Sequence, residues 1–397
     1  ALRKQQGYIG SSLQRLFSQS VATEISAAPS DFKYQMELIF ESEELRRKWV
    51  ASPEHQNTAW PAAEALADEY KWLGYDVAGV DQAIPLQPLF GIRNAESQID
   101  LNKPSEPVKL DVWNSALRKL ISPSANLELL AGGFQFTEGP CWDNLRGCLY
   151  FSDVPGNTMY RYTNDGKVNV YRKPSNNSNG ITFDKEGRLI ACEHHTRRLT
   201  RERGDDLDII ASTYKGKKLN SPNDTIVAND GSIIFSDPAY GLLPGLGGPA
   251  EAELAFKGVY RIPPRGGEPE LIADDFEAPN GVVLSPDESK LYVIDSIRKH
   301  IRVFNVGSGW KVTGGDVFIE IKDESNEIPD GMKIDVNGNF FCTGPKGIWI
   351  FTNKAKLLGR ILLPEVAANL GWGGPDRDTL YITASTGLYR LRTLTGG

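Results

Sequence analysis

The chain has 397 residues, of which 40% are hydrophobic and 24% charged, so it is long enough to bury a large core. Its formal net charge of −7 gives no indication of the basic face that binding to nucleic acid requires. No apolar run reaches the ~18 residues of a membrane-spanning helix, and the few cysteines and histidines show no zinc-ligand spacing.

Residues 1–30 have the composition of a targeting segment. Arg3, Lys4 and Arg15 are basic, serine is frequent, and no acidic residue precedes Glu24. The apolar residues recur at spacings that could form one helical face. This pattern is typical of a mitochondrial presequence, and a flexible basic N-terminus is the alternative. We therefore expect an intracellular protein, either mitochondrial or cytoplasmic.

The region from residue 31 to residue 125 predicts a partly helical extension. Apolar residues recur at three- and four-residue spacing, so helices are expected over 34–50, 60–74 and 108–121. Residues 81–107 are rich in proline and polar side chains and predict a surface linker. Such an extension could contact a protein partner.

Residues 126–397 contain six similar segments of about fifty residues each. Each has a polar turn followed by a strand-forming run, as in "ANDGSIIFSD" from Ala228. Units of this length can each supply four short strands, which predicts an all-β, six-bladed β-propeller. A long β-sandwich is the alternative, but six matched units argue against it. The turn residues that mark the segments are Asp143, Asp184, Asp230, Asp287, Asn337 and Asp376.

One carboxylate or carboxamide residue stands shortly before each of these turns. Equivalent positions of a propeller converge on its axis, so we expect these side chains to surround the central channel. Their oxygens suit Ca²⁺, with Mg²⁺, Mn²⁺ or Zn²⁺ as alternatives, which predicts one divalent-metal site. Asn-Gly and Asp-Gly are also ordinary turn pairs, but six in register exceed what turns alone explain. The six residues are Glu138, Asn179, Asn223, Asn280, Asp330 and Asn369.

The four cysteines form no C-x-x-C pair. Cys141 and Cys148 could face each other across a hairpin, so one disulfide is an alternative. Reduced core cysteines are the expectation.

Four motifs carry a family likeness: "FTEGPCW", "SPND", "PNGVVLSPDESKLYVIDS" and "PDGMKID". In this order they resemble the SMP-30/gluconolactonase family, and bacterial-type gluconolactonases in particular, over about residues 126–392. The resemblance implies a six-bladed propeller with one catalytic divalent metal in the channel. It also implies that Glu138, Asn280 and Asp330 are metal ligands. Asn223 is then a further ligand or a substrate contact.

The remaining site residues follow less directly. The resemblance places Asp224 behind Asn223, whereas Asn179 and Asn369 rest on the repeat register. Two features depart from the family pattern. About 120 residues precede the Glu-Gly-Pro motif, and "CEHH" carries both His194 and His195 where one histidine followed by a small residue is expected. The second histidine could narrow the substrate pocket or lie on the surface.

The chemistry implied by the resemblance is hydrolysis of a lactone such as glucono-1,5-lactone to the aldonic acid. A bound cation polarises the carbonyl and activates water, while Asp330 is both ligand and general base, and Asn223 a second catalytic candidate. A phosphotriesterase-like hydrolase and a non-catalytic propeller of a larger assembly are the alternatives. Residues 237–254, rich in glycine and proline, could cover the channel mouth or decorate its rim.

Overall fold

The computed structural model describes residues 8–15, 34–40 and 105–397. The chain divides into two compact units, residues 1–82 and 83–397. No helix among the described residues is long and apolar enough to cross a membrane.

In the described part of the first unit, β1 (Tyr8–Arg15) pairs antiparallel with β2 (Tyr34–Phe40). The helix predicted over 34–50 is therefore wrong over β2. Apolar and polar residues alternate from Tyr34 to Leu38, which is the period of a strand, and pairing with β1 satisfies the backbone. The helical face expected in the first residues is likewise wrong over β1. The other predictions for residues 1–104 lie outside the described residues.

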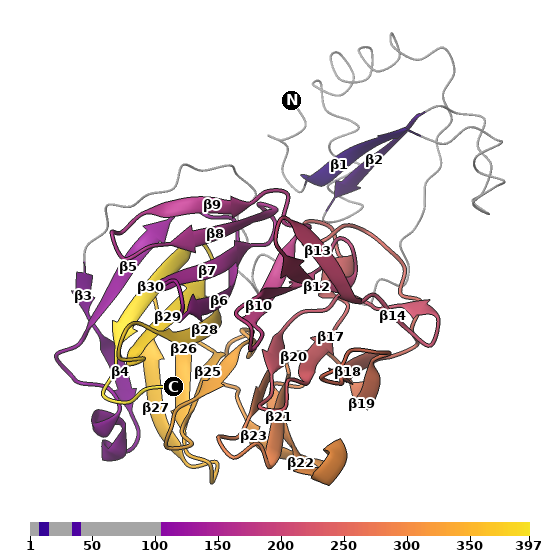
Figure 1. The fold of residues 1–397 in the computed structure, drawn as a ribbon. Coiled ribbons are helices and arrows are strands. Elements are labelled where there is room, and N and C mark those ends of the chain that lie inside the picture. Colours follow the sequence, from indigo (N-terminus) through magenta and orange to yellow (C-terminus); the bar gives the residue numbers. More distant parts are fainter. Residues whose placement is uncertain (1–7, 16–33, 41–104) are drawn as a thin grey trace, which may run out of the picture. The chain divides into compact units, whose positions relative to one another are not determined.

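Six antiparallel sheets form the predicted six-bladed β-propeller and follow one another in chain order (Figure 1). Within each blade the strands pair consecutively from the axis outward, and the innermost strands β6, β10, β16, β20, β24 and β28 contact one another round the ring. Inner strands such as β7 are buried at every position, so they read as apolar runs rather than alternating patterns.

The strands of the first three blades are as follows. Blade 1 comprises β6 (Thr137–Asp143), β7 (Cys148–Asp153), β8 (Thr158–Tyr162) and β9 (Val168–Arg172). Blade 2 comprises β10 (Ser178–Phe183), β11 (Leu189–Glu193), β12 (Arg198–Arg203) and β13 (Asp206–Ala211). After the ribbon β14 (Thr213–Tyr214) and β15 (Lys217–Lys218), blade 3 comprises β16 (Thr225–Val227), β17 (Ile233–Asp237), β18 (Lys257–Ile262) and β19 (Glu270–Phe276).

The strands of the last three blades complete the ring. Blade 4 comprises β20 (Pro279–Leu284), β21 (Lys290–Asp295), β22 (His300–Gly307) and β23 (Lys311–Glu320), with the 3-10 turn η5 (Ser308–Trp310) between the last two. Blade 5 comprises β24 (Met332–Ile334), β25 (Phe340–Gly344), β26 (Gly347–Phe351) and β27 (Leu357–Leu362). Blade 6 comprises β28 (Ala367–Gly373), β29 (Thr379–Ala384), β30 (Gly387–Arg392) and β5 (Asn126–Gly132).

Blade 6 closes the ring with a strand from the other end of the propeller. Strand β5 pairs antiparallel with β30, and Arg390 donates to Glu128 across the pair at 2.7 Å. Because a blade buries its faces only against its neighbours, this pairing stabilises every blade at once.

Two further strands precede residue 126, where the sequence placed the start of the propeller. Strand β3 (Ser105–Pro107) extends blade 6 and β4 (Lys109–Val112) extends blade 5. The helix predicted over 108–121 is wrong: a strand is followed by the short 3-10 helix η3 (Ser115–Lys119). Free backbone groups at the edge of blade 5 pair with β4, and this outweighs the local helical pattern.

The core lies in layers between neighbouring blades. Between blades 6 and 1, Trp142 stacks on Tyr381 with ring centroids 5.5 Å apart. Trp142, Trp349 and Trp372 are all buried in this core. All four cysteines are free, as expected.

Candidate functional site

The six residues predicted to surround the channel lie at or beside the start of the innermost strands, and all are at least 96% buried. Five of them line one small cavity on the axis, and Asn369 does not. His194 lines it as well, together with three residues that the sequence did not single out. The lining is Phe136, Glu138, Asn179, His194, Asn223, Tyr240, Leu246, Asn280 and Asp330.

Glycine follows four of these six polar residues and allows the inner strands to approach one another. The Gly180 N–H donates to the Asn223 carbonyl of the next blade at 2.8 Å, and the Gly281 N–H donates to the Asp330 carbonyl at 2.9 Å. A Cβ on Gly281 would lie 2.6 Å from that carbonyl oxygen, and one on Gly180 would lie 2.8 Å from the Asp224 Cα. The repeated polar–Gly pair is thus a packing requirement at the axis, not a turn.

Glu138 is a buried carboxyl held in one orientation. Its Oε2 accepts the Gly139 N–H at 2.8 Å and the Asn369 Nδ2–H at 3.1 Å. Burial raises the pKa of Glu138 to about 7, and the nearby Asp224 charge acts in the same direction. Asn369 therefore positions a lining residue.

Asp330 and Asn280 lie beside this carboxyl. Burial raises the pKa of Asp330 well above its ordinary value, and the charges of Glu138 and Asp224 add to the rise. Asn280 donates from Nδ2 to Ser296 Oγ at 3.0 Å. Its Oδ1 is buried and has no hydrogen-bond partner within the described part of the chain. Ser296 thus helps to hold the amide of this cavity-lining residue in place.

Asn223 and its neighbour have different surroundings. The Asn223 side chain lines the cavity, while its main chain donates to Ser236 O at 2.9 Å. The Asp224 carboxylate accepts the Thr225 N–H at 3.0 Å and the Val282 N–H at 3.2 Å, which joins blade 3 to blade 4. Its charge reaches the site, but its hydrogen bonds go to the backbone.

The two histidines of "CEHH" differ in burial. His194 is 1% exposed, and its Nδ1 lies 3.0 Å from the Leu246 carbonyl oxygen. Burial lowers the pKa of His194 to about 4, so the ring is neutral near pH 7 and Nδ1–H is the donor. His195 is exposed and contacts the Gly247 carbonyl oxygen at 2.6 Å. It is not among the residues that line the cavity.

A cover loop, residues 238–256, spans the channel mouth and contains the 3-10 turn η4 (Tyr240–Leu242). Although it belongs to blade 3, its Leu246 and Tyr240 pack in one apolar cluster with Phe136, Ile328 and Ala368 of other blades. The cavity beneath has a volume of about 10 Å³, on the order of one water-sized sphere. The structure therefore holds the site closed.

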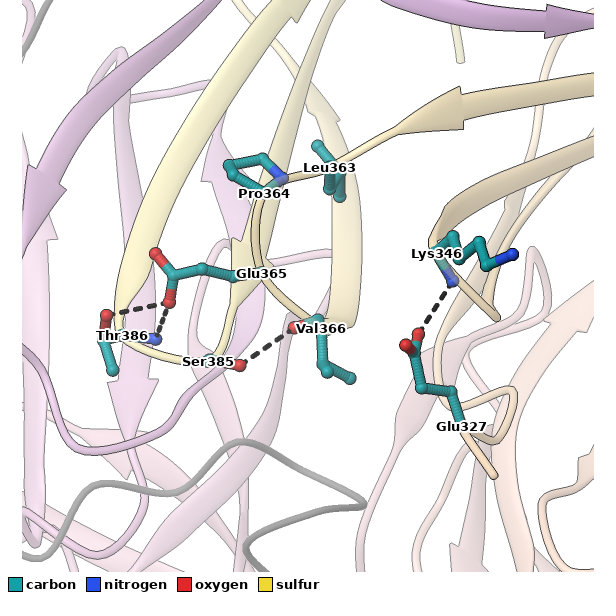
Figure 2. Close-up of a pocket in the computed structure, with 8 residues that line it drawn as sticks. All are labelled: Glu327, Lys346, Leu363, Pro364, Glu365, Val366, Ser385 and Thr386. Carbon is teal, nitrogen blue, oxygen red and sulfur yellow. Dashed lines mark hydrogen bonds between the residues drawn. The ribbon is translucent and has the colours of Figure 1, made fainter. Parts of the chain in front are cut away.

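A larger cavity of about 370 Å³ lies between blades 5 and 6, and several of its polar groups pair with one another (Figure 2). The Thr386 N–H and hydroxyl both donate to Glu365, and the Lys346 N–H donates to Glu327. None of the predicted site residues lines it. The axial cavity is therefore the candidate site.

The axial cavity offers an oxygen-rich set for a cation. Across the residues that the structure describes, no three His, Cys, Asp or Glu side chains converge as a ligand group. The set here combines two carboxyls with amides. The buried Oδ1 of Asn280 lacks a partner in the described residues, and Asn280 lines the cavity with Glu138 and Asp330. Such hard, unsatisfied oxygens fit a divalent cation.

Several contributors were missed from the sequence. Phe136, Tyr240 and Leu246 line the cavity from loops, and Ser296 lies just behind Asn280. A Ser or Thr recurs as the penultimate residue of the second strand of most blades, as in "FSD" and "CTG", but Ser296 follows the end of its strand and so lies outside this register. Thr343 of this set accepts the Asp330 N–H at 2.9 Å.

Comparison with known proteins gives a consistent result. The family described as the SMP-30/gluconolactonase/LRE-like region has a sequence model that matches residues 136–386 of this chain. A gluconolactonase of Zymomonas mobilis is 33% identical over 73% of this chain and 87% of its own length. The structure of a gluconolactonase from Xanthomonas campestris is 34% identical, covers 73% of this chain and 98% of its own, and superposes with a TM-score of 0.69.

A more distant structure shares the fold alone. It is a calcium-binding regucalcin from Agrobacterium tumefaciens, 14% identical, which covers 66% of this chain and 92% of its own with a TM-score of 0.57. The match to the family covers more than half of the chain and contains the motifs that first indicated it. The chain belongs to the SMP-30/gluconolactonase/LRE-like family.

Proposed function

We propose that this propeller is a lactonase that hydrolyses a sugar lactone, such as glucono-1,5-lactone, to the aldonic acid with one divalent cation. The observation that carries the proposal is the convergence of two buried carboxyls and the unpartnered amide oxygen of Asn280 on one axial cavity, within the described residues. The gluconolactonases among the relatives support the choice of reaction.

The residues that would hold the cation are Glu138, Asn280 and Asp330, with Asn223 as a further candidate. Two carboxylates side by side repel each other when ionised, and a divalent ion between them removes that cost. Oxygen ligands favour Ca²⁺, with Mg²⁺, Mn²⁺ or Zn²⁺ as alternatives. When bound, such a cation polarises a carbonyl and lowers the pKa of a water molecule.

Asp330 is the residue we assign to proton transfer. Its carboxylate accepts a proton from water as the water oxygen bonds to the lactone carbonyl carbon. The bond from that carbon to the ring oxygen then breaks, and the ring oxygen takes the proton held by Asp330 to become the hydroxyl of the product, which restores the carboxylate. Asn369 keeps Glu138 in place, and Ser296 keeps Asn280 in place.

The cover loop controls access and excludes bulk water. A cavity of about 10 Å³ cannot contain a sugar lactone, so the loop must move before the substrate binds. Closure would bring Tyr240 and Leu246 over the bound ring. Such a movement is a common source of rate limitation in enzymes with covered sites.

The test is a panel of sugar lactones and phosphotriesters, each assayed with and without chelator. Opening of sugar lactones that disappears with chelator is the expected result, and Asp330→Asn should abolish it while the far-UV spectrum stays unchanged. Asp287→Asn, in an exposed turn of blade 4, is the control and should retain activity. Phosphotriester hydrolysis without lactone opening, or neither activity, would refute the proposal.

A further inference from the structure

Blade 2 contributes two hydrogen-bond acceptors to the axial cavity that the cation chemistry does not require. They are His194 Nε2 and Asn179 Oδ1, both buried and both without a partner in the described chain. The residues are 1% and 4% exposed. A buried polar atom without a partner destabilises the folded state, so these atoms point to a ligand that satisfies them.

The acceptor role of His194 Nε2 follows from the other side of the ring. Nδ1 contacts the Leu246 carbonyl oxygen, which can only accept, so Nδ1 carries the hydrogen. In the neutral ring Nε2 then has a lone pair and no hydrogen. The cover loop therefore fixes which nitrogen of His194 faces the cavity.

The cover loop also fixes the position of the ring. Gly247 and Gly241 lie against His194, and a Cβ on Gly247 would lie 2.9 Å from the His194 Cβ. The ring is thus clamped between blade 2 and the loop. An acceptor held this firmly loses little entropy when it binds a donor.

We propose that His194 Nε2 and Asn179 Oδ1 form a hydroxyl-binding subsite that selects lactones with free hydroxyl groups on the ring. The inference rests on the lactonase function proposed above and assigns its choice of substrate to two residues of blade 2. Each atom accepts a hydrogen bond from a ring hydroxyl, while the carbonyl carbon lies toward Asp330 on the other side of the cavity. Unsubstituted lactones and phosphotriesters have no O–H donor and leave both atoms unsatisfied.

The test compares D-glucono-1,5-lactone with δ-valerolactone, the same six-membered ring without hydroxyls. In His194→Asn the amide Nδ2 can still donate to Leu246 O, but no atom replaces Nε2. We expect kcat/KM for gluconolactone, divided by kcat/KM for δ-valerolactone, to fall about tenfold in this variant. That factor corresponds to one neutral hydrogen bond. Asn179→Leu should lower the same ratio. His195→Asn, which touches the loop outside the cavity, should leave the ratio unchanged.

The outcomes separate the subsite from the proposed function. If the wild type opens gluconolactone and the ratio stays constant in both His194→Asn and Asn179→Leu, the subsite is wrong and the function stands. If both substrates lose the same factor, the residues are structural and the subsite is again wrong. If the wild type opens neither lactone, the function fails and the subsite with it.

Discussion

Replacing Glu138 with glutamine is expected to change how the stability of the metal-free protein depends on pH. Burial raises the pKa of this carboxyl from 4.5 to about 7 in the folded protein. The folded chain therefore holds the proton more tightly than the unfolded chain. The stabilising contribution is fully present below pH 4.5 and is lost as the pH rises through about 7.

The size of the effect follows from the shift. Each pKa unit is worth about 1.4 kcal/mol, so the free energy of unfolding should fall by about 3 kcal/mol between these pH values through Glu138 alone. Asp330, whose pKa is also raised, acts in the same direction. Other titrating groups, such as Asp237 and His194, contribute to both proteins and cancel in the difference.

The assay is urea unfolding of the wild type and of Glu138→Gln in the presence of chelator, over pH 4.5 to 8. The stability of the wild type relative to the variant should fall by about 3 kcal/mol across that range. Saturating Ca²⁺ is the control, because an ion that binds only the folded chain at a hundredfold excess over Kd restores about 2.7 kcal/mol. Parallel pH dependences for the two proteins would refute the reasoning.

Three other substitutions probe separate parts of the molecule. Ser296→Ala removes the hydroxyl that orients Asn280, so calcium affinity measured by calorimetric titration should fall ten- to a hundredfold, and an unchanged Kd would contradict this role. Gly247→Val places side-chain atoms against His194 and should prevent the cover loop from seating, which raises KM severalfold; normal steady-state kinetics would show that the loop does not need this contact. Phe151→Ala opens a void in a fully buried layer and should lower the free energy of unfolding by about 3–5 kcal/mol in urea, whereas a loss below 1 kcal/mol would mean that the blades repack.

The local sequence pattern was sufficient to predict the repeated parts of the fold. Each blade repeats a polar turn and an apolar run, so six blades could be predicted from spacing alone. The convergence of Glu138, Asn179, Asn223, Asn280 and Asp330 then followed from the symmetry of a propeller, and the structure places all five on one cavity.

Features that depend on neighbours in space could not be predicted in this way. Strand β5 completes blade 6 by pairing with β30. The two strands lie more than two hundred residues apart in the sequence, so no local pattern indicates the pairing. Asn369 occupies the sixth equivalent position, yet its amide turns to Glu138. The roles of His194 and Ser296 depend on which loop or strand lies against them. Over Tyr34–Phe40 helical and strand spacings overlap, and pairing with β1 decided between them.

The most direct test of the central claim measures cation content and lactone opening in one sample. The metal-free protein should not accelerate the opening of glucono-1,5-lactone above its uncatalysed rate. Stepwise addition of Ca²⁺ should restore activity in proportion to occupancy, with saturation at one ion per chain. Full activity in the metal-free protein, or no activity with Ca²⁺, Mg²⁺, Mn²⁺ or Zn²⁺ at full occupancy, would contradict the claim that this axial site is a metal-dependent lactonase centre.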